Sequence, residues 1–116
     1  MEKGEWIMLN CQNNTITLTR GDTAVLRLDI TDEKGNPYKL TDSDVVIFTL
    51  KKSVMERDVI FQKSMSNGKI VIQPQDTESL EYGQYFYDVE LTKEDGFVAT
   101  VIPPHRFIVA EEVTWG

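Results

Sequence analysis

The chain has 116 residues, of which 41% are hydrophobic and 27% are charged, and its formal net charge is −7. This length and composition predict one globular domain with a modest core. The 12 basic residues are scattered among 19 acidic ones, so no basic face is expected and nucleic acid is excluded as a partner. No apolar run approaches the roughly 18 residues of a membrane span, and Met1–Leu9 is too short and acidic for a signal peptide.

Alternation of apolar and polar residues predicts strands along most of the chain. Ile16 and Leu18 share one face of the first strand, and the second strand alternates in the same way. The third is an almost continuous apolar run, which favours a central position in a sheet or a second face against a partner. The predicted strands span residues 15–19, 23–31, 45–50, 59–63, 69–73, 84–92, 97–102 and 106–109.

Turn-forming residues separate these strands. Asp32–Pro37 is typical of a hairpin loop, and Asn67-Gly68 is the strongest hairpin signal in the chain. Pro74 followed by Asp76–Ser79 predicts one helical turn. Pro103-Pro104 cannot donate hydrogen bonds to a ladder, so we expect the last strand to break there, at a sheet edge or where the chain changes sheets.

Seven or eight short strands with one helical turn predict an all-β, antiparallel β-sandwich. The segment Asp76–Leu91 is typical of a corner of such a sandwich, where Leu80 and Gly83 precede the next strand. We expect the Tyr85 hydroxyl to bond the backbone of the crossing loop. The predicted organisation is an N-terminal arm at residues 1–14, one domain at 15–113 and a tail at 114–116.

No catalytic constellation, metal site or cofactor site is predicted. Cys11 and His105 are single residues far apart in sequence. Asp42 and Asp44 are better interpreted as part of a solvated turn than as calcium ligands. Asp88 and Glu90 lie on the polar face of a strand. The strand alternation places Tyr85 and Tyr87 in the core, which leaves a carbohydrate platform as the lesser alternative.

Four segments together resemble small immunoglobulin-like proteins of tailed phages and prophages, closest to the N-terminal domain of the baseplate upper protein. The resemblance covers about residues 15–113. It implies an immunoglobulin-like fold and a non-catalytic structural role in a virion, with no catalytic residues to transfer. The segments that carry it are Ile16–Thr23, Asp32–Tyr38, Pro74–Thr77 and Leu80–Val89.

The resulting hypothesis is an assembly module of a phage tail or baseplate, located in the bacterial host cytoplasm during assembly or in the virion. Its partners are expected to be further copies of the chain or other virion proteins, with no nucleic acid and no membrane. The apolar arm could add a strand to a neighbour's sheet. The alternative is an immunoglobulin-like module that binds glycans or a cell surface. The two tryptophans are interpreted either as caps on the ends of the core or as surfaces for a neighbour. The candidate interface residues are Trp6, Ile7, Leu9 and Trp115.

Overall fold

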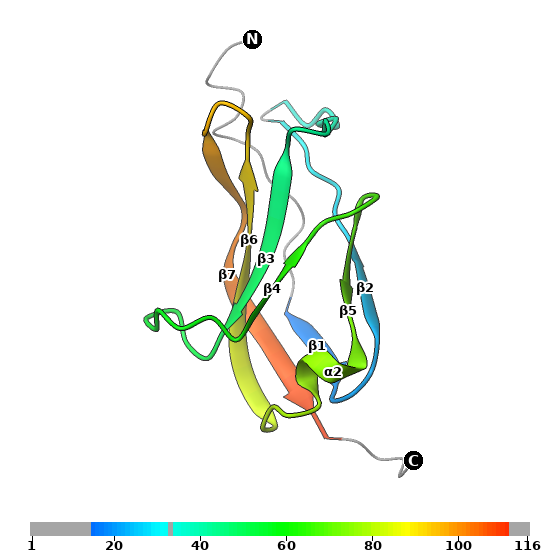
Figure 1. Ribbon diagram of the computed structural model, residues 1–116, viewed down its shortest axis with the longest axis vertical. Helices are drawn as coiled ribbons and strands as arrows, with labels where there is room; N and C mark the ends of the chain where they lie inside the picture. Colours follow the sequence, from blue (N-terminus) through cyan, green and yellow to red (C-terminus); the bar gives the residue numbers. More distant parts are fainter. Residues whose placement is uncertain (1–14, 33, 112–116) are drawn as a thin grey trace.

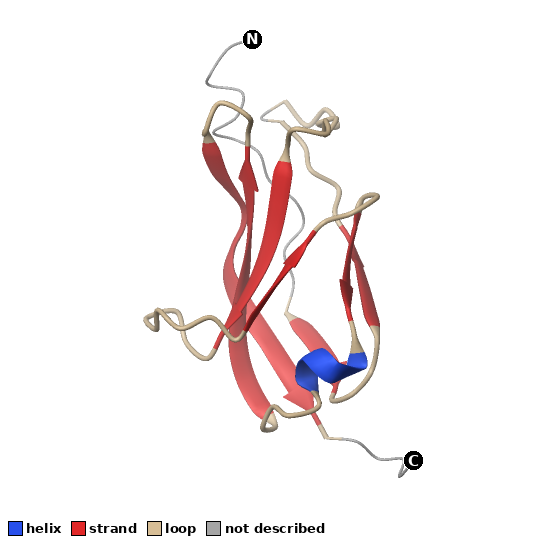
Figure 2. Cartoon of the chain, in the orientation of Figure 1, coloured by secondary structure: helices blue, strands red, loops and turns tan. Residues whose placement is uncertain are grey.

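The computed structural model describes residues 15–32 and 34–111, and these form a β-sandwich with one short helix (Figures 1 and 2). This confirms the predicted all-β fold class, with seven strands. The elements are β1 (Ile16–Thr19), β2 (Ala24–Arg27), β3 (Val45–Lys51), β4 (Phe61–Ser64), β5 (Lys69–Ile72), α2 (Pro74–Thr77), β6 (Gly83–Thr92) and β7 (Val98–Ala110). The predicted arm at residues 1–14 and tail at 114–116 lie outside the described residues, so the domain limits stay a prediction.

The strands form a five-stranded sheet in the order β1-β7-β6-β3-β4 and a two-stranded sheet in the order β2-β5. All pairs are antiparallel except β1 with β7, where Ile16–Thr19 runs parallel to Phe107–Ala110. The expectation of a wholly antiparallel sandwich was therefore wrong at this pair. Parallel neighbours need a long connection between them, and the rest of the domain supplies it here.

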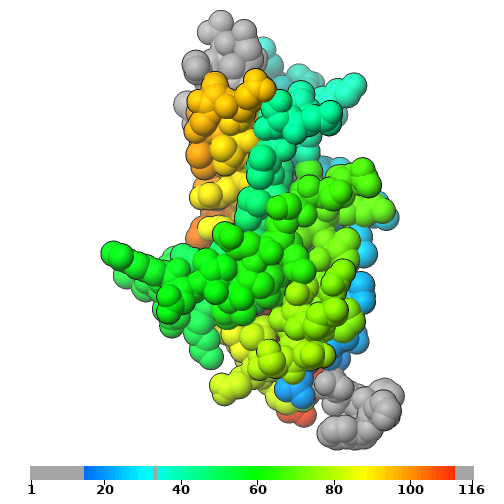
Figure 3. Space-filling model, viewed as in Figure 1, coloured from blue at the N-terminus to red at the C-terminus, as the bar shows by residue number. Residues whose placement is uncertain are grey.

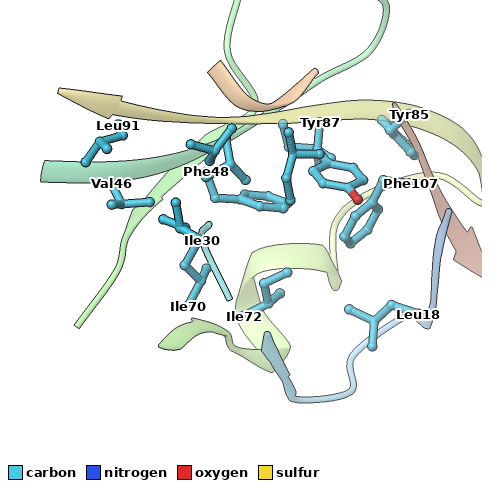
Figure 4. Packing of buried hydrophobic residues seen from close by; sticks show 14 of the residues in the cluster. Leu18, Ile30, Val46, Phe48, Ile70, Ile72, Tyr85, Tyr87, Leu91 and Phe107 are labelled. Atoms are coloured by element: carbon cyan, nitrogen blue, oxygen red, sulfur yellow. The ribbon is translucent and has the colours of Figure 1, made fainter. Parts of the chain in front are cut away.

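The core lies between the two sheets and is centred on Phe48 (Figure 4). The Phe48 ring stacks on Tyr87, with centroids 5.2 Å apart, and meets Phe107 edge-on at 6.1 Å. Tyr85 and Tyr87 are each only 3% exposed. The alternation correctly placed both tyrosines in the core, and their burial removes them from any carbohydrate platform.

The two prolines of β7 do not break the strand, contrary to expectation. β7 runs from Val98 to Ala110 and lies between β1 and β6, inside the sheet. Tyr87 pairs with His105 and Val89 with Ile102, so Asp88 alone faces Pro103 and Pro104. This bulge absorbs the missing N–H groups. The β1 pairing begins only at Phe107, so the prolines interrupt no ladder on that side either.

The corner before β6 is fixed by hydrogen bonds from side chains to the backbone. The Tyr85 hydroxyl donates to the carbonyl oxygen of Glu81 at 2.7 Å. Thr77 of α2 is fully buried, and its Oγ1 accepts from the Gly21 backbone N–H at 2.9 Å. The Leu80 N–H donates to the Thr77 carbonyl, and Gly83 adopts a φ of 139°. The corner residues therefore connect the β1–β2 turn, α2 and β6.

Candidate functional site

A groove of about 220 Å³ follows β2 on the side opposite β5. Its lining includes the four consecutive residues Val25, Leu26, Arg27 and Leu28. Successive side chains of a strand point to opposite faces, so a cavity that meets four in a row must border the edge of the strand. The other wall is formed by Ile16, Tyr87 and Ile102.

Among the described strands, β5 alone pairs with β2, so the edge of β2 beside the groove is open in this part of the chain. Within residues 15–32 and 34–111, the ladder partner of β2 is β5, from Ala24↔Ile72 to Arg27↔Lys69. In an antiparallel pair, alternate residues point their backbone N–H and C=O groups away from the partner strand. Those groups of β2 point toward the groove. The groove therefore combines an apolar wall with a row of backbone donors and acceptors.

The outer face of the two-stranded sheet adds a distinctive surface. Val25 and Val71 lie directly opposite each other and are 49% and 39% exposed. Two pairs further along the same ladder, Arg27 lies opposite Lys69. Like charges directly opposite each other repel, so an acidic group placed near this pair would be favourable. The β2 edge thus has an apolar middle and a cationic end.

A second, smaller depression of about 40 Å³ lies on the outer face of the five-stranded sheet, lined by Thr49, Phe86, Asp88 and Pro104 among others. Burial raises the pKa of Asp88 above its ordinary value of 3.8; the neighbouring Glu90 raises it further and Lys51 opposes the shift. Asp88 faces the proline bulge, which explains its partial desolvation. The depression is too small for a ligand beyond a few atoms.

The 52–60 loop between β3 and β4 protrudes from the molecule (Figures 1 and 3). Met55 is 90% exposed and Val54 is 51% exposed. Val54 also borders the small depression beside Phe86. The loop offers a few apolar atoms to solvent but no concave surface of its own.

Asp44 and His105, which the sequence analysis considered as possible metal ligands or catalytic groups, both lie near other residues of the domain. Asp44 accepts hydrogen bonds from the Tyr38 hydroxyl and the Thr41 N–H, and forms an ion pair with Lys93 at 3.0 Å. His105 Nδ1 lies 3.4 Å from Thr15 Oγ1. In the described part of the chain, no three His, Cys, Asp or Glu side chains are grouped so as to hold a metal ion. No described helix has the length and apolar character needed to span a membrane.

The predicted interface residues Trp6, Ile7, Leu9 and Trp115, and also Cys11, lie outside the described residues. Of the predicted corner residues, Leu80 lies in the loop between α2 and β6, whereas Gly83 and Tyr85 lie within the first three residues of β6. The β2 edge was not singled out from the sequence. Its signal was present in Val25, an apolar residue at an outward-facing position.

Comparison with protein-family models and with curated proteins finds no match for this sequence. The fold is similar to that of solved structures that include CopC from Methylosinus trichosporium OB3b, with a TM-score of 0.50. The two chains are 9% identical, and the alignment covers 93% of this chain and 99% of CopC. At this identity the likeness shows the fold alone, and it supports the immunoglobulin-like β-sandwich.

The resemblance to phage baseplate proteins was wrong, because the likeness found is to CopC and no comparison points to a phage protein. The virion role, the tail and baseplate assignment and the host-cytoplasmic location depended on that resemblance, and they are withdrawn with it. The reason is physical. The segments that carried the resemblance form β1, two turns, α2 and the tyrosine corner with the first part of β6, and sandwiches of unrelated function share such elements. The chain is an immunoglobulin-like β-sandwich.

Proposed function

We propose that this chain is a non-catalytic binding module that accepts an extended segment of a partner protein along the edge of β2. The observation that carries the proposal is the groove beside Val25–Leu28, where a strand edge and an apolar wall face each other. An added strand would bond the β2 backbone and place alternate side chains against Ile16 and Ile102. Backbone bonds supply affinity in this mode, and the side-chain positions supply selectivity.

The composition of the groove supports binding over catalysis. Among the described residues, the side chains that line it are apolar except for Arg27 and the hydroxyl of Tyr87. A catalytic site needs a nucleophile or an acid beside a base in such a cavity, whereas strand addition needs only an edge and apolar contacts. The proposal therefore assigns recognition of a protein segment to this surface.

The test is site-specific photo-crosslinking in cells that produce the protein. A photoreactive residue replaces Val25 at the groove or Val98 on β7, since the two valines are 49% and 52% exposed. We expect an adduct from position 25, mapped by mass spectrometry to one extended apolar segment, and none from position 98. A synthetic peptide of that segment should then slow amide exchange in β2. Equal labelling from both positions, or no protection of β2, would refute the proposal.

A further inference from the structure

The groove limits what its occupant can be. The four lining residues Val25–Leu28, which are the last three of β2 and the residue after it, correspond to about 13 Å of extended chain. The wall opposite is made by Ile16 and Ile102, with Leu26 and Leu28 on the β2 side, so an inward-facing side chain should be large and apolar. An occupant of about four residues, rich in strand formers, is required.

The chain itself carries such a segment. Trp6-Ile7-Met8-Leu9 is a run of four large apolar residues, preceded by Glu5 and followed by Asn10. Aromatic and β-branched residues fit a pleated, half-buried strand. Glu5 also supplies the acidic group that the Arg27–Lys69 end of the edge favours. The length and apolar character of Trp6–Leu9 and the charge of Glu5 therefore all match the groove beside β2.

The position of this segment in the sequence favours a second copy of the chain as its acceptor. Ile16, the first residue of β1, forms part of the groove wall. The four residues directly before it are polar: Gln12, Asn13, Asn14 and Thr15. Leu9 is seven residues before Ile16, which is about 23 Å of extended chain. Direct continuation of β1 would bring the polar residues to the chain's own groove and carry Trp6–Leu9 past it.

We infer that Trp6–Leu9 of one copy adds to β2 of a second copy, and that the exchange is reciprocal in a two-fold dimer. This inference rests on the proposed function and names its partner. Each arm fills the neighbour's groove, with Glu5 near the neighbour's Arg27. The dimer buries both grooves and both apolar segments at once.

The test is the mass of the full chain by light scattering during size-exclusion chromatography. We expect about 27 kDa, twice the 13.3 kDa of one chain. Ile7→Glu and Met8→Glu, which cover both strand registers, should reduce at least one form to a monomer. Val25→Glu should do the same, whereas the control Val98→Glu should stay dimeric. Circular dichroism and urea midpoints establish that every variant is folded.

The outcomes separate this inference from the proposed function. A monomeric full chain, or a dimer that survives Ile7→Glu, Met8→Glu and Val25→Glu alike, overturns the exchanged dimer. If position 25 still crosslinks to a foreign segment in that case, the proposed binding edge stands and only its partner is wrong. As a positive control, a peptide of residues 2–14 added to the monomeric arm variant should slow amide exchange in β2. A monomeric full chain whose β2 is already protected would show that the arm fills its own groove, which also refutes the dimer.

Discussion

Removing the Tyr85 hydroxyl tests how much the corner contributes to stability. In Tyr85→Phe, the 2.7 Å hydrogen bond to the Glu81 carbonyl is lost while the ring, 3% exposed, stays in the core. A buried carbonyl left without a donor costs up to about 3 kcal/mol, but Glu81 is exposed and water can replace the donor. We therefore expect a loss of about 1 kcal/mol. For a domain of this size, that lowers Tm by about 4 °C.

The assay is urea unfolding followed by far-UV circular dichroism, with calorimetry for Tm. Tyr82→Phe is the matched control, because Tyr82 lies in the same corner but is 43% exposed. Its ring keeps the contact with the Arg20 guanidinium, which lies 4.3 Å from the ring centroid. We expect the control to match the parent. Equal stability of Tyr85→Phe and the parent, or an equal loss in both variants, would refute the role given to the Tyr85 hydroxyl.

Three further variants test the core, the connection to α2 and the outer face. Phe48→Ala removes the ring at the centre of the core, which is fully buried, and should cost about 3–5 kcal/mol in urea unfolding; a loss below 1 kcal/mol would contradict its central place. Thr77→Val leaves the Gly21 N–H without its acceptor and should cost about 1–3 kcal/mol, whereas an unchanged midpoint would show that the bond contributes nothing. The pKa of Asp88 is raised on folding, so its favourable contribution is present below the ordinary value of 3.8 and is lost as pH rises through the raised value. Asp88→Asn should therefore be more stable than the parent at neutral pH and lose this advantage in acid; a constant difference across pH would contradict the desolvation of Asp88.

The sequence predicted those parts of the fold that depend on local chemistry. Alternation identified the buried face of β6. Asn67-Gly68 forms a tight turn, with φ of 54° and 76° and the bridge Ser66↔Lys69, but the strands on either side of it, β4 and β5, belong to different sheets. The prediction of a strand break at Pro103-Pro104 was wrong, because a bulge against Asp88 depends on the partner strand and is not encoded in β7 alone. The parallel pairing of β1 with β7 joins residues about 90 positions apart, and no local pattern specifies it.

The binding edge was hidden for a related reason. Alternation in residues 23–31 predicts which side chains of this strand face inward, but it does not say which edge remains open after the sheets assemble. That depends on β5 pairing with one side of β2 and on Ile16 and Ile102 lying across from the other. Val25, exposed and apolar, was the one local sign.

The parallel pairing of β1 with β7 also determines how the domain would respond to force. The chain enters at the start of β1 and leaves at the end of β7, so tension on its two ends pulls these strands in opposite directions along their length (Figure 1). All four register pairs, from Ile16↔Phe107 to Thr19↔Ala110, then carry the load together in shear. An antiparallel pair pulled from its open end would separate one pair at a time. The domain is therefore built to resist stretching along the chain much better than peeling at β4, its other sheet edge.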